Sequence, residues 1–175
     1  MKKVEVVPHN PNWRNEFEKE AEKIKAALGE TLVAVHHIGS TAIVGIYAKP
    51  VIDILVEVRD ISEVNARSGE VESLGYEVMG EFGIPGRRYF RKDNREGIRT
   101  HQVHTFAADS AQGRRHLAFR DFMNAHRVEA QKYSELKRKL AAENPNNMDG
   151  YIEGKDAFIK EIDRRAAYWL ALQSG

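Results

Sequence analysis

The sequence contains no cysteine and no long apolar run. The absence of cysteine from its 175 residues excludes disulfides and thiolate metal sites and fits a reducing compartment. No stretch approaches the roughly 20 apolar residues that a bilayer-spanning helix needs. Residues 1–8 hold two lysines with no apolar segment behind them, unlike a secretory signal. These absences predict a cytoplasmic protein with no membrane partner.

An excess of charge of either sign is also absent. The 27 basic and 26 acidic side chains leave a formal charge of +1, so steering of the whole molecule toward nucleic acid is not expected. Basic residues nevertheless gather in one stretch, where a solvated surface and a surface facing a polyanion both remain open. The members of this stretch are Arg87, Arg88, Arg91, Lys92, Arg95 and Arg99, followed by Arg114, Arg115 and Arg120.

The length and the balance of residue types predict one globular domain over residues 1–175. Apolar residues make up 42% and charged residues 30% of the chain, an ordinary balance for a folded protein. No repeat, low-complexity tract or long linker divides the chain. The expected strands do not alternate regularly with helices, which favours an α+β fold: a mixed β-sheet with flanking helices and a helical C-terminal third.

Apolar periodicity and turn residues predict where the helices and strands lie. Apolar side chains recur every three or four residues from Trp13 to Leu28, as on one face of a helix. Strands are expected at 4–7, 31–38, 51–58 and 76–79 and in a hairpin formed by 87–92 and 99–106; further helices are expected at 60–74, 110–126, 128–143 and 149–170.

The strand at 51–58 carries a carboxylate on an otherwise apolar background. Because side chains alternate along a strand, one face is entirely apolar and the other holds Asp53, Leu55 and Glu57. An unpaired Asp53 would suffer a large desolvation cost, so its partner should be a metal ion, a basic side chain or several backbone donors. Glu57 lies roughly 13 Å further along the strand, too far to share one ion with Asp53.

The turn Gly39-Ser40-Thr41 follows directly on the strand at 31–38. Small residues allow a ligand to approach the backbone closely. Amides and hydroxyls at such a turn can hold phosphate oxygens, although the same residues also serve as a simple cap.

Taken together, these features resemble the signature of polymerase-β-like nucleotidyltransferases. A strand leads to Gly39-Ser40, and after twelve intervening residues Asp53 lies on a second apolar strand. The longer segments 37–42, 48–55, 99–104, 116–122 and 155–159 resemble the GrpB-like family of that superfamily. The resemblance implies a nucleotidyltransferase-like fold, a phosphate contacted at Gly39-Ser40, and Mg²⁺ or another divalent metal held by Asp53. Some relatives resemble a domain fused behind dephospho-coenzyme A kinase, which suggests nucleotide or coenzyme A chemistry by association.

Leu55 departs from the superfamily pattern. A metal-dependent nucleotidyltransferase usually carries a second acidic residue two positions after the first, and that position here is Leu55. Either distant groups complete the metal site, or the polymerase-type mechanism has been lost.

Histidines are the candidates to complete the site. His101 and His104 could bind a metal with Asp53, although residues three apart on a strand face opposite ways unless a bulge or twist intervenes. His37 could bind metal or act as an acid or base near the turn, or it could simply fix the turn through a hydrogen bond.

Basic residues could hold the phosphate. Lys49 could reach a phosphate or neutralise Asp53, and Arg88 and Arg99 could clamp phosphate oxygens. Arg120 could bind phosphate, pair with Asp53 or anchor its helix to the sheet. Side chains of later helices could also project into the same pocket; these are Tyr133, Lys137 and Lys155.

These residues predict a protein that binds a nucleotide or other phosphorylated small molecule with a divalent metal, transfer activity being open. Asp53, Lys49 and His37 are the catalytic candidates. Gly39, Ser40, Thr41, Arg88, Arg99 and Arg120 are the phosphate-binding candidates, and Asp53, His101 and His104 are the metal ligands. The alternatives are a noncatalytic module for a nucleotide or coenzyme A precursor and a His/Asp metal-dependent hydrolase. RNA is a weaker candidate partner because no aromatic stacking motif accompanies the basic residues.

Overall fold

One five-stranded mixed sheet runs through the computed structural model, which describes residues 3–174. Its strand order is β1-β2-β5-β4-β3. The central pair β2 and β5 is parallel, whereas the other neighbours are antiparallel. This confirms the expected mixed sheet. The strands are β1 (Leu32–Ile38), β2 (Ile52–Val58), β3 (Glu77–Val78), β4 (Arg88–Asp93) and β5 (Arg99–Ala107).

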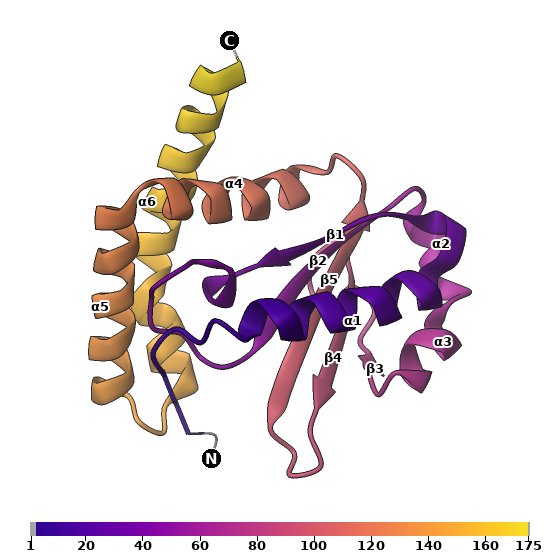
Figure 1. Cartoon of the computed structure of the whole chain (residues 1–175), viewed down its shortest axis with the longest axis horizontal. Helices are drawn as coiled ribbons and strands as arrows, with labels where there is room; N and C mark the ends of the chain where they lie inside the picture. Colours follow the sequence, from indigo (N-terminus) through magenta and orange to yellow (C-terminus); the bar gives the residue numbers. More distant parts are fainter. Residues whose placement is uncertain (1–2, 175) are drawn as a thin grey trace.

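Helices flank the sheet and make up the C-terminal part of the chain (Figure 1). They are α1 (Trp13–Leu28), α2 (Ile61–Asn65), α3 (Ser68–Ser73), α4 (Ala111–Ala125), α5 (Arg127–Glu143) and α6 (Met148–Ser174). Within residues 3–174 no helix combines the length and hydropathy needed to cross a membrane. The helical C-terminal third is confirmed.

Two local expectations were wrong. The single helix expected at 60–74 is two short helices, because the chain turns at Arg67, whose backbone (φ −101°, ψ 4°) leaves the helical conformation. The strand expected at 4–7 is one antiparallel bridge from Val7 to Ala48. Pro8 follows that bridge at once and has no amide hydrogen with which to extend the pairing.

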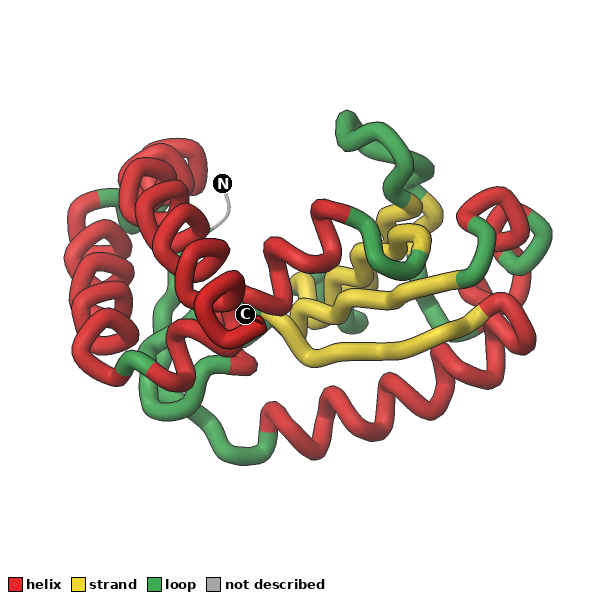
Figure 2. Tube along the Cα trace, turned by 90° about the horizontal axis from the view of Figure 1, so that it is seen from above, coloured by secondary structure: helices red, strands yellow, loops and turns green. Residues whose placement is uncertain are grey.

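The main core lies between α1 and the sheet, and Figure 2 shows α1 running along that face. Trp13, Ile24 and Leu28 pack from α1 against the even-numbered residues of β2. All four of those residues, Ile52, Ile54, Val56 and Val58, are at most 2% exposed. The alternation expected for this strand is therefore confirmed, and Asp53 points to the opposite face.

The opposite face of the sheet is covered by α4 and the C-terminal helices. Ile38 and Leu55 form a small apolar cluster with Phe106, against which Leu117 of α4 packs. A second cluster joins the C-terminal helices to one another. The loop between β1 and β2 inserts Ile43 and Ile46 into that cluster, so this loop is held between the sheet and the helices.

A buried ion pair links α1 to the sheet on the main-core face. Lys92 of β4 pairs with Glu20 of α1. The Tyr76 hydroxyl donates a 2.8 Å hydrogen bond to the same carboxylate. Burial raises the pKa of Glu20, but the hydrogen bonds from Lys92 and Tyr76 outweigh it and leave that pKa below its usual 4.5. Glu20 therefore contributes stability above pH 4.5 that is lost as the pH falls through its lowered folded-state pKa.

We predict that Glu20→Gln lowers the free energy of unfolding at pH 7 by about 1–3 kcal/mol, because it leaves the part-buried Lys92 charge without its carboxylate partner. The deficit relative to wild type should shrink as the pH is lowered below 4.5. Urea unfolding at pH 7, 5, 4 and 3 measures this deficit in unfolding free energy, and Glu22→Gln on the exposed side of α1 is the control. A deficit that is the same at every pH would contradict the role given to the Glu20 carboxylate.

Candidate functional site

Asp53 lies directly against the turn that follows β1. Gly39 has a positive φ of 74°. A Cβ atom placed on Gly39 would lie 2.8 Å from Asp53 Oδ2, closer than atoms pack. Only glycine therefore lets the backbone of this turn meet the carboxylate, and the two parts of the sequence motif come together as expected.

A chain of two side chains orients Asp53 from the other side. Arg87 donates to Nδ1 of His104 at 3.3 Å. Because a guanidinium has no acceptor, Nδ1 must accept, and the ring hydrogen is on Nε2, which lies 3.4 Å from Asp53 Oδ1. Arg87 is itself only 7% exposed and also donates to the carbonyl oxygens of Glu81 and Phe82. Both nitrogens of His104 are thus engaged, and neither is left to bind a metal.

A cavity of about 230 Å³ opens beside Asp53. We call it the Asp53 cavity. All its lining residues except Val51 and Gly39 carry polar side chains, and Asp53 is the only carboxylate among them. They are Gly39 and Ser40 of the turn, Lys49, Val51 and Asp53 around the start of β2, Gln102 of β5, Tyr133 and Lys137 of α5, and Tyr151 and Lys155 of α6.

Lys137 is the most deeply buried of the three lysines. Its side chain comes from α5 and the residue is 1% exposed. Within residues 3–174 its Nζ atom has no hydrogen-bond partner, and neither has the hydroxyl of Tyr151. Burial lowers the pKa of Lys137 well below 10.5, and the neighbouring charges of Lys155 and Lys49 lower it further. The cavity therefore contains two buried donors, the Lys137 amine and the Tyr151 hydroxyl, to which a ligand could supply a hydrogen-bond acceptor.

The other two lysines lie around Tyr151. The Nζ atom of Lys155 is 4.4 Å from the centre of the Tyr151 ring, and that of Lys49 is 5.7 Å from it. Burial lowers the pKa of Lys155 to about 8, with Lys49 adding to the effect. Lys49 also donates to the sulfur of Met148 at 3.7 Å. Three amines thus share one small volume, where an anion would relieve their mutual repulsion.

Tyr133 joins the turn to the C-terminal helices. Its hydroxyl is hydrogen-bonded to Ser40, and its ring stacks on Phe158 of α6 at 5.5 Å between ring centres. Burial raises the pKa of Tyr133 to about 12, so its hydroxyl keeps its proton at neutral pH. Ser40 is consequently fixed at the rim of the cavity.

The structure does not bring together the expected metal set of Asp53, His101 and His104. Strand β5 stays in register with β2 from His101 to Ala107, so no bulge turns His101 toward Asp53. His101 instead faces α1, where its ring lies 6.4 Å from that of Tyr76. Within residues 3–174 no group of three or more His, Asp or Glu side chains could hold a metal ion.

His37 and Thr41, expected in catalysis and phosphate binding, form a structural pair on the α1 side. His37 Nε2 is 2.8 Å from the Thr41 hydroxyl, and its ring stacks on Phe17 at 4.9 Å. Burial lowers the pKa of His37 to about 4, so the ring is neutral near pH 7. Neither residue lines the Asp53 cavity. The alternative, a hydrogen bond that fixes the turn, is what the structure contains.

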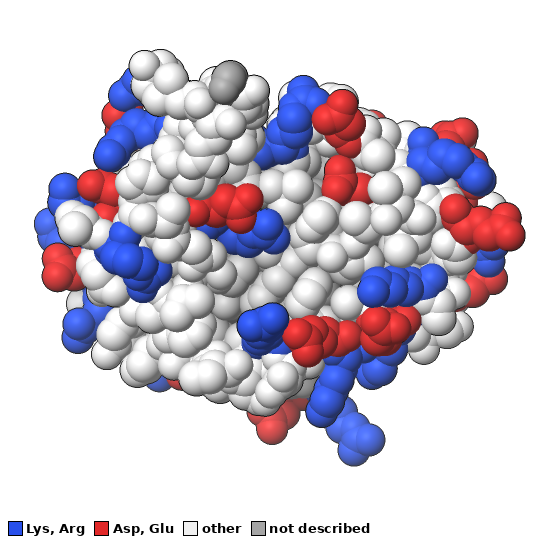
Figure 3. Space-filling view, turned by 45° about the horizontal axis from the view of Figure 1, so that its top comes forward, with Lys and Arg blue, Asp and Glu red and all other residues white. Residues whose placement is uncertain are grey.

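The three arginines expected to clamp phosphate do not line the Asp53 cavity either. Arg88 donates to Asn65 Oδ1 at 2.8 Å, and Arg99 pairs with Asp93 at 2.5 Å. Arg120 donates to the carbonyl oxygen of His37 at 3.1 Å and so anchors α4 to β1. On the face seen in Figure 3, basic and acidic side chains lie interspersed, which argues for a solvated surface there.

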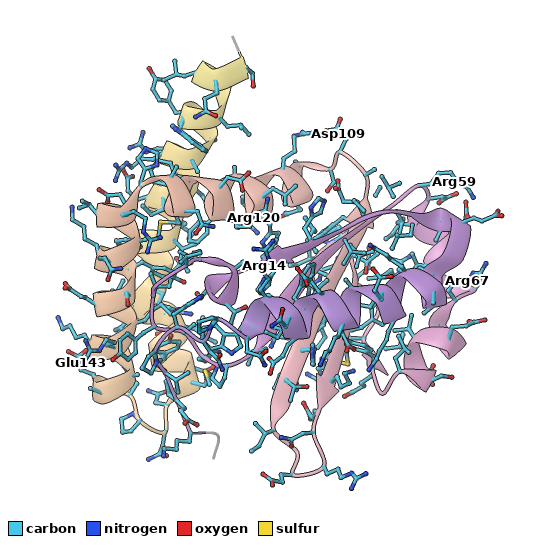
Figure 4. All side chains as sticks on the ribbon, viewed as in Figure 1. Arg14, Arg59, Arg67, Asp109, Arg120 and Glu143 are labelled. Atoms are coloured by element: carbon cyan, nitrogen blue, oxygen red, sulfur yellow. The ribbon has the colours of Figure 1, made fainter. Side chains whose placement is uncertain are left out.

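A larger hollow of about 640 Å³ lies between α1 and α4. Arg14 and Arg120, labelled in Figure 4, are on its rim. Arg14 pairs with Glu18 and Arg120 with Asp121, so these charges are already compensated. The unpartnered donors are in the smaller Asp53 cavity, which is therefore the candidate site.

Comparison with known proteins places this arrangement in a family. The model described as "GrpB protein" matches residues 3–165. The chain belongs to the GrpB protein family. The crystal structure of conserved protein GrpB from Enterococcus faecalis has a TM-score of 0.89 and 44% sequence identity, covering 94% of this chain and 99% of that one. The resemblance inferred from the sequence is thereby confirmed.

Two further relatives are longer proteins. YqkA of Bacillus subtilis (strain 168) is 42% identical over 168 residues, which cover 96% of this chain and 48% of YqkA. A protein named dephospho-CoA kinase from Mycolicibacterium paratuberculosis is 23% identical over 189 residues, covering 95% of this chain and 46% of the kinase. The chain thus spans about half the length of each of these relatives.

In this GrpB-family protein, Leu55 leaves no room for a second carboxylate. It is fully buried and packs with Ile38 and Phe106 beneath α4. A pair of metal ions requires several carboxylate oxygens, whereas the Asp53 cavity offers one carboxylate among three lysines. The donor set does not fit a two-metal centre.

Tyr151 and Gln102 were not among the site residues expected from the sequence, and Arg87 was expected only as a member of the basic stretch. Tyr133, Lys137 and Lys155 were expected only as residues that could project into the pocket. A usable signal was present. Tyr133 and Lys137 on α5 and Tyr151 and Lys155 on α6 are two tyrosine–lysine pairs at four-residue spacing, which puts both members on one helix face. Lys137 falls on the buried stripe of α5 together with Ala130, Tyr133 and Leu140. A lysine on a buried stripe is rare without a partner.

We predict that Gly39→Ala costs about 2 kcal/mol more stability than Gly83→Ala. Both glycines have positive φ, 74° and 85°, so both alanines suffer backbone strain. Only at Gly39 must the new Cβ also displace Asp53, because nothing lies within 4 Å of the Gly83 position. Urea unfolding of the two variants measures the difference. Equal losses of unfolding free energy would show that the Asp53 side chain can move aside at no cost in stability.

Proposed function

We propose that this protein binds a phosphorylated small molecule, of the nucleotide or coenzyme A precursor class, in the Asp53 cavity. The observation that carries the proposal is the buried Nζ atom of Lys137 in the wall of that cavity, which lies 4.9 Å from the centre of the Tyr133 ring but has no hydrogen-bond partner within residues 3–174. Burying a charge or a polar group without a partner costs free energy. A ligand that supplied the acceptor would recover that cost on binding.

A phosphate group fits the donors better than other acceptors do. It offers at least three strong acceptor oxygens at once. Lys137 and Tyr151 present unpartnered donors, and Lys49 and Lys155 add positive charge around the same volume. Ser40 adds a hydroxyl at the rim, which supports the expected phosphate contact at the Gly39-Ser40 turn.

The lysines would neutralise the phosphate charge, a role that the sequence analysis expected a divalent metal to fill. Mg²⁺ is usually held by one or two carboxylates together with phosphates of the ligand. Here Asp53 would be the one carboxylate for such an ion, with three lysines beside it. We therefore propose that phosphate binding does not require Mg²⁺.

A binding module is favoured over the two enzyme hypotheses. Nucleotidyl transfer through two metal ions lacks its carboxylates because Leu55 is a core residue. A His/Asp metal-dependent hydrolase lacks its ligands because His37 and His101 face α1. The similarity to a protein named dephospho-CoA kinase supports a nucleotide or coenzyme A precursor as the ligand class.

We predict that Lys137→Met stabilises the ligand-free protein by about 1–3 kcal/mol, because it removes a buried unsatisfied group. The same change should abolish the rise in melting temperature that phosphate, ATP, CTP or coenzyme A causes in wild type. Thermal melts with and without EDTA measure both effects. Lys139→Met on the exposed side of α5 should leave stability and ligand response unchanged.

Two results would contradict this account. A flat response to all four compounds in wild type would remove the phosphate site. An increase in melting temperature that EDTA abolishes and Mg²⁺ restores would return the site to the metal-dependent hypothesis.

We predict that phosphate affinity falls as the pH rises through about 8, since Lys155 loses its proton there. Its protonated form, present below that pH, attracts the ligand. Titration calorimetry at pH 7 and pH 9.5 should show a loss of about tenfold, equivalent to roughly 1.4 kcal/mol. Lys155→Arg should reduce the pH dependence because a guanidinium keeps its charge; an unaltered profile would exclude Lys155 as its source.

A further inference from the structure

The Asp53 cavity is lined by two chemically opposite kinds of group. Amines and hydroxyls of α5 and α6 can donate hydrogen bonds, and the Asp53 carboxylate of β2 can accept them. We propose that the ligand is correspondingly bifunctional, a phosphorylated sugar whose phosphate monoester meets the lysines while a sugar hydroxyl donates to Asp53. This inference rests on the proposed function and adds the group that meets Asp53.

The first argument is electrostatic. A carboxylate repels a phosphate at contact distance and attracts a hydroxyl donor. The side chain of Asp53 is 28% exposed in the wall of the cavity, so an occupant of that cavity meets it. Within residues 3–174 it receives one side-chain hydrogen bond, from His104, whereas a carboxylate has about four acceptor sites. The ligand group beside Asp53 is therefore a donor.

The second argument is that Asp53 is held as an acceptor. Arg87 donates to Nδ1 of His104, so the hydrogen on Nε2 points at Asp53. The rings of Tyr89 and His116 lie 5.4 and 5.7 Å from that of His104 and restrict its orientation. Gly39 packs against the other carboxylate oxygen. These contacts orient one carboxylate toward the cavity and serve no evident purpose in binding phosphate alone.

The third argument is size. A volume of about 230 Å³ lies below the roughly 300–1,000 Å³ typical of pockets for drug-sized ligands. It suits a phosphate with an attached sugar better than a complete nucleoside triphosphate. Gln102 lies opposite Asp53 in the β2–β5 register and also lines the cavity, where its amide can donate to or accept from a second hydroxyl.

The test compares two small probes, D-ribose 5-phosphate and methyl phosphate, by titration calorimetry at pH 7 in EDTA. Wild type should bind ribose 5-phosphate at least about tenfold more tightly, equivalent to roughly 1.4 kcal/mol. Asp53→Asn should weaken ribose 5-phosphate while tightening methyl phosphate, because the repulsive charge is gone. A general structural effect of the substitution would instead move both affinities in the same direction.

Asp109→Asn is the matched control, since Asp109 lies in the exposed loop before α4 (Figure 4) and pairs there with Arg114. It should leave both affinities unchanged. Gln102→Leu provides a second variant should Asp53→Asn fold poorly, and it should weaken ribose 5-phosphate about tenfold with little effect on methyl phosphate. A melting temperature for each variant verifies folding.

The outcomes separate this inference from the function beneath it. If both probes bind wild type equally and Asp53→Asn changes them in parallel, hydroxyl recognition is overturned while phosphate binding stands. If neither probe nor inorganic phosphate binds, the proposed function itself fails. A third arm with AMP identifies the source of the sugar phosphate: tighter binding of AMP indicates a nucleotide, and equal binding a free sugar phosphate.

Discussion

The confinement of three lysine amines and one carboxylate in a small buried volume is the constraint on which this site depends. Lys137 is only 1% exposed, and within residues 3–174 its amine has no hydrogen-bond partner. A fold selected for stability alone would place an apolar side chain there. Burying the Lys137 amine without a hydrogen-bond partner lowers the stability of the ligand-free protein, and a ligand that supplies the acceptor recovers that loss. For this reason we interpret the cavity as a binding site.

The fold brings two separate parts of the chain to this cavity. The sheet supplies Asp53, and the C-terminal helices supply the amines; the loop between β1 and β2 lies between them. Tyr133 holds that loop through Ser40, and Ser134 of α5 accepts a 2.9 Å hydrogen bond from the amide of Tyr47. Because the same loop carries the Gly39-Ser40 turn, for which we propose a phosphate contact, packing of the C-terminal helices also shapes the site.

Local pattern predicted the fold well and the site in part. Alternation along β2 and the helical period of α1 report burial directly, so both elements and the direction of Asp53 followed from the sequence. The position of Gly39 beside Asp53 followed from the family resemblance. Pattern could not place His37 and His101, because the side of a strand that a polar residue faces depends on which helix covers it. Nor could it bring α5 and α6 to β2, since Tyr133 and Lys155 lie 80 and 102 positions after Asp53 in the sequence.

A crystal structure of the protein with D-ribose 5-phosphate, grown in EDTA, tests the central claim most directly. The account predicts the phosphate within hydrogen-bond distance of Lys137 Nζ and the Tyr151 hydroxyl, with a sugar hydroxyl on Asp53 and no cation between them. Density for the ligand only in the hollow between Arg14 and Arg120, or an empty Asp53 cavity at saturating ligand, would contradict it.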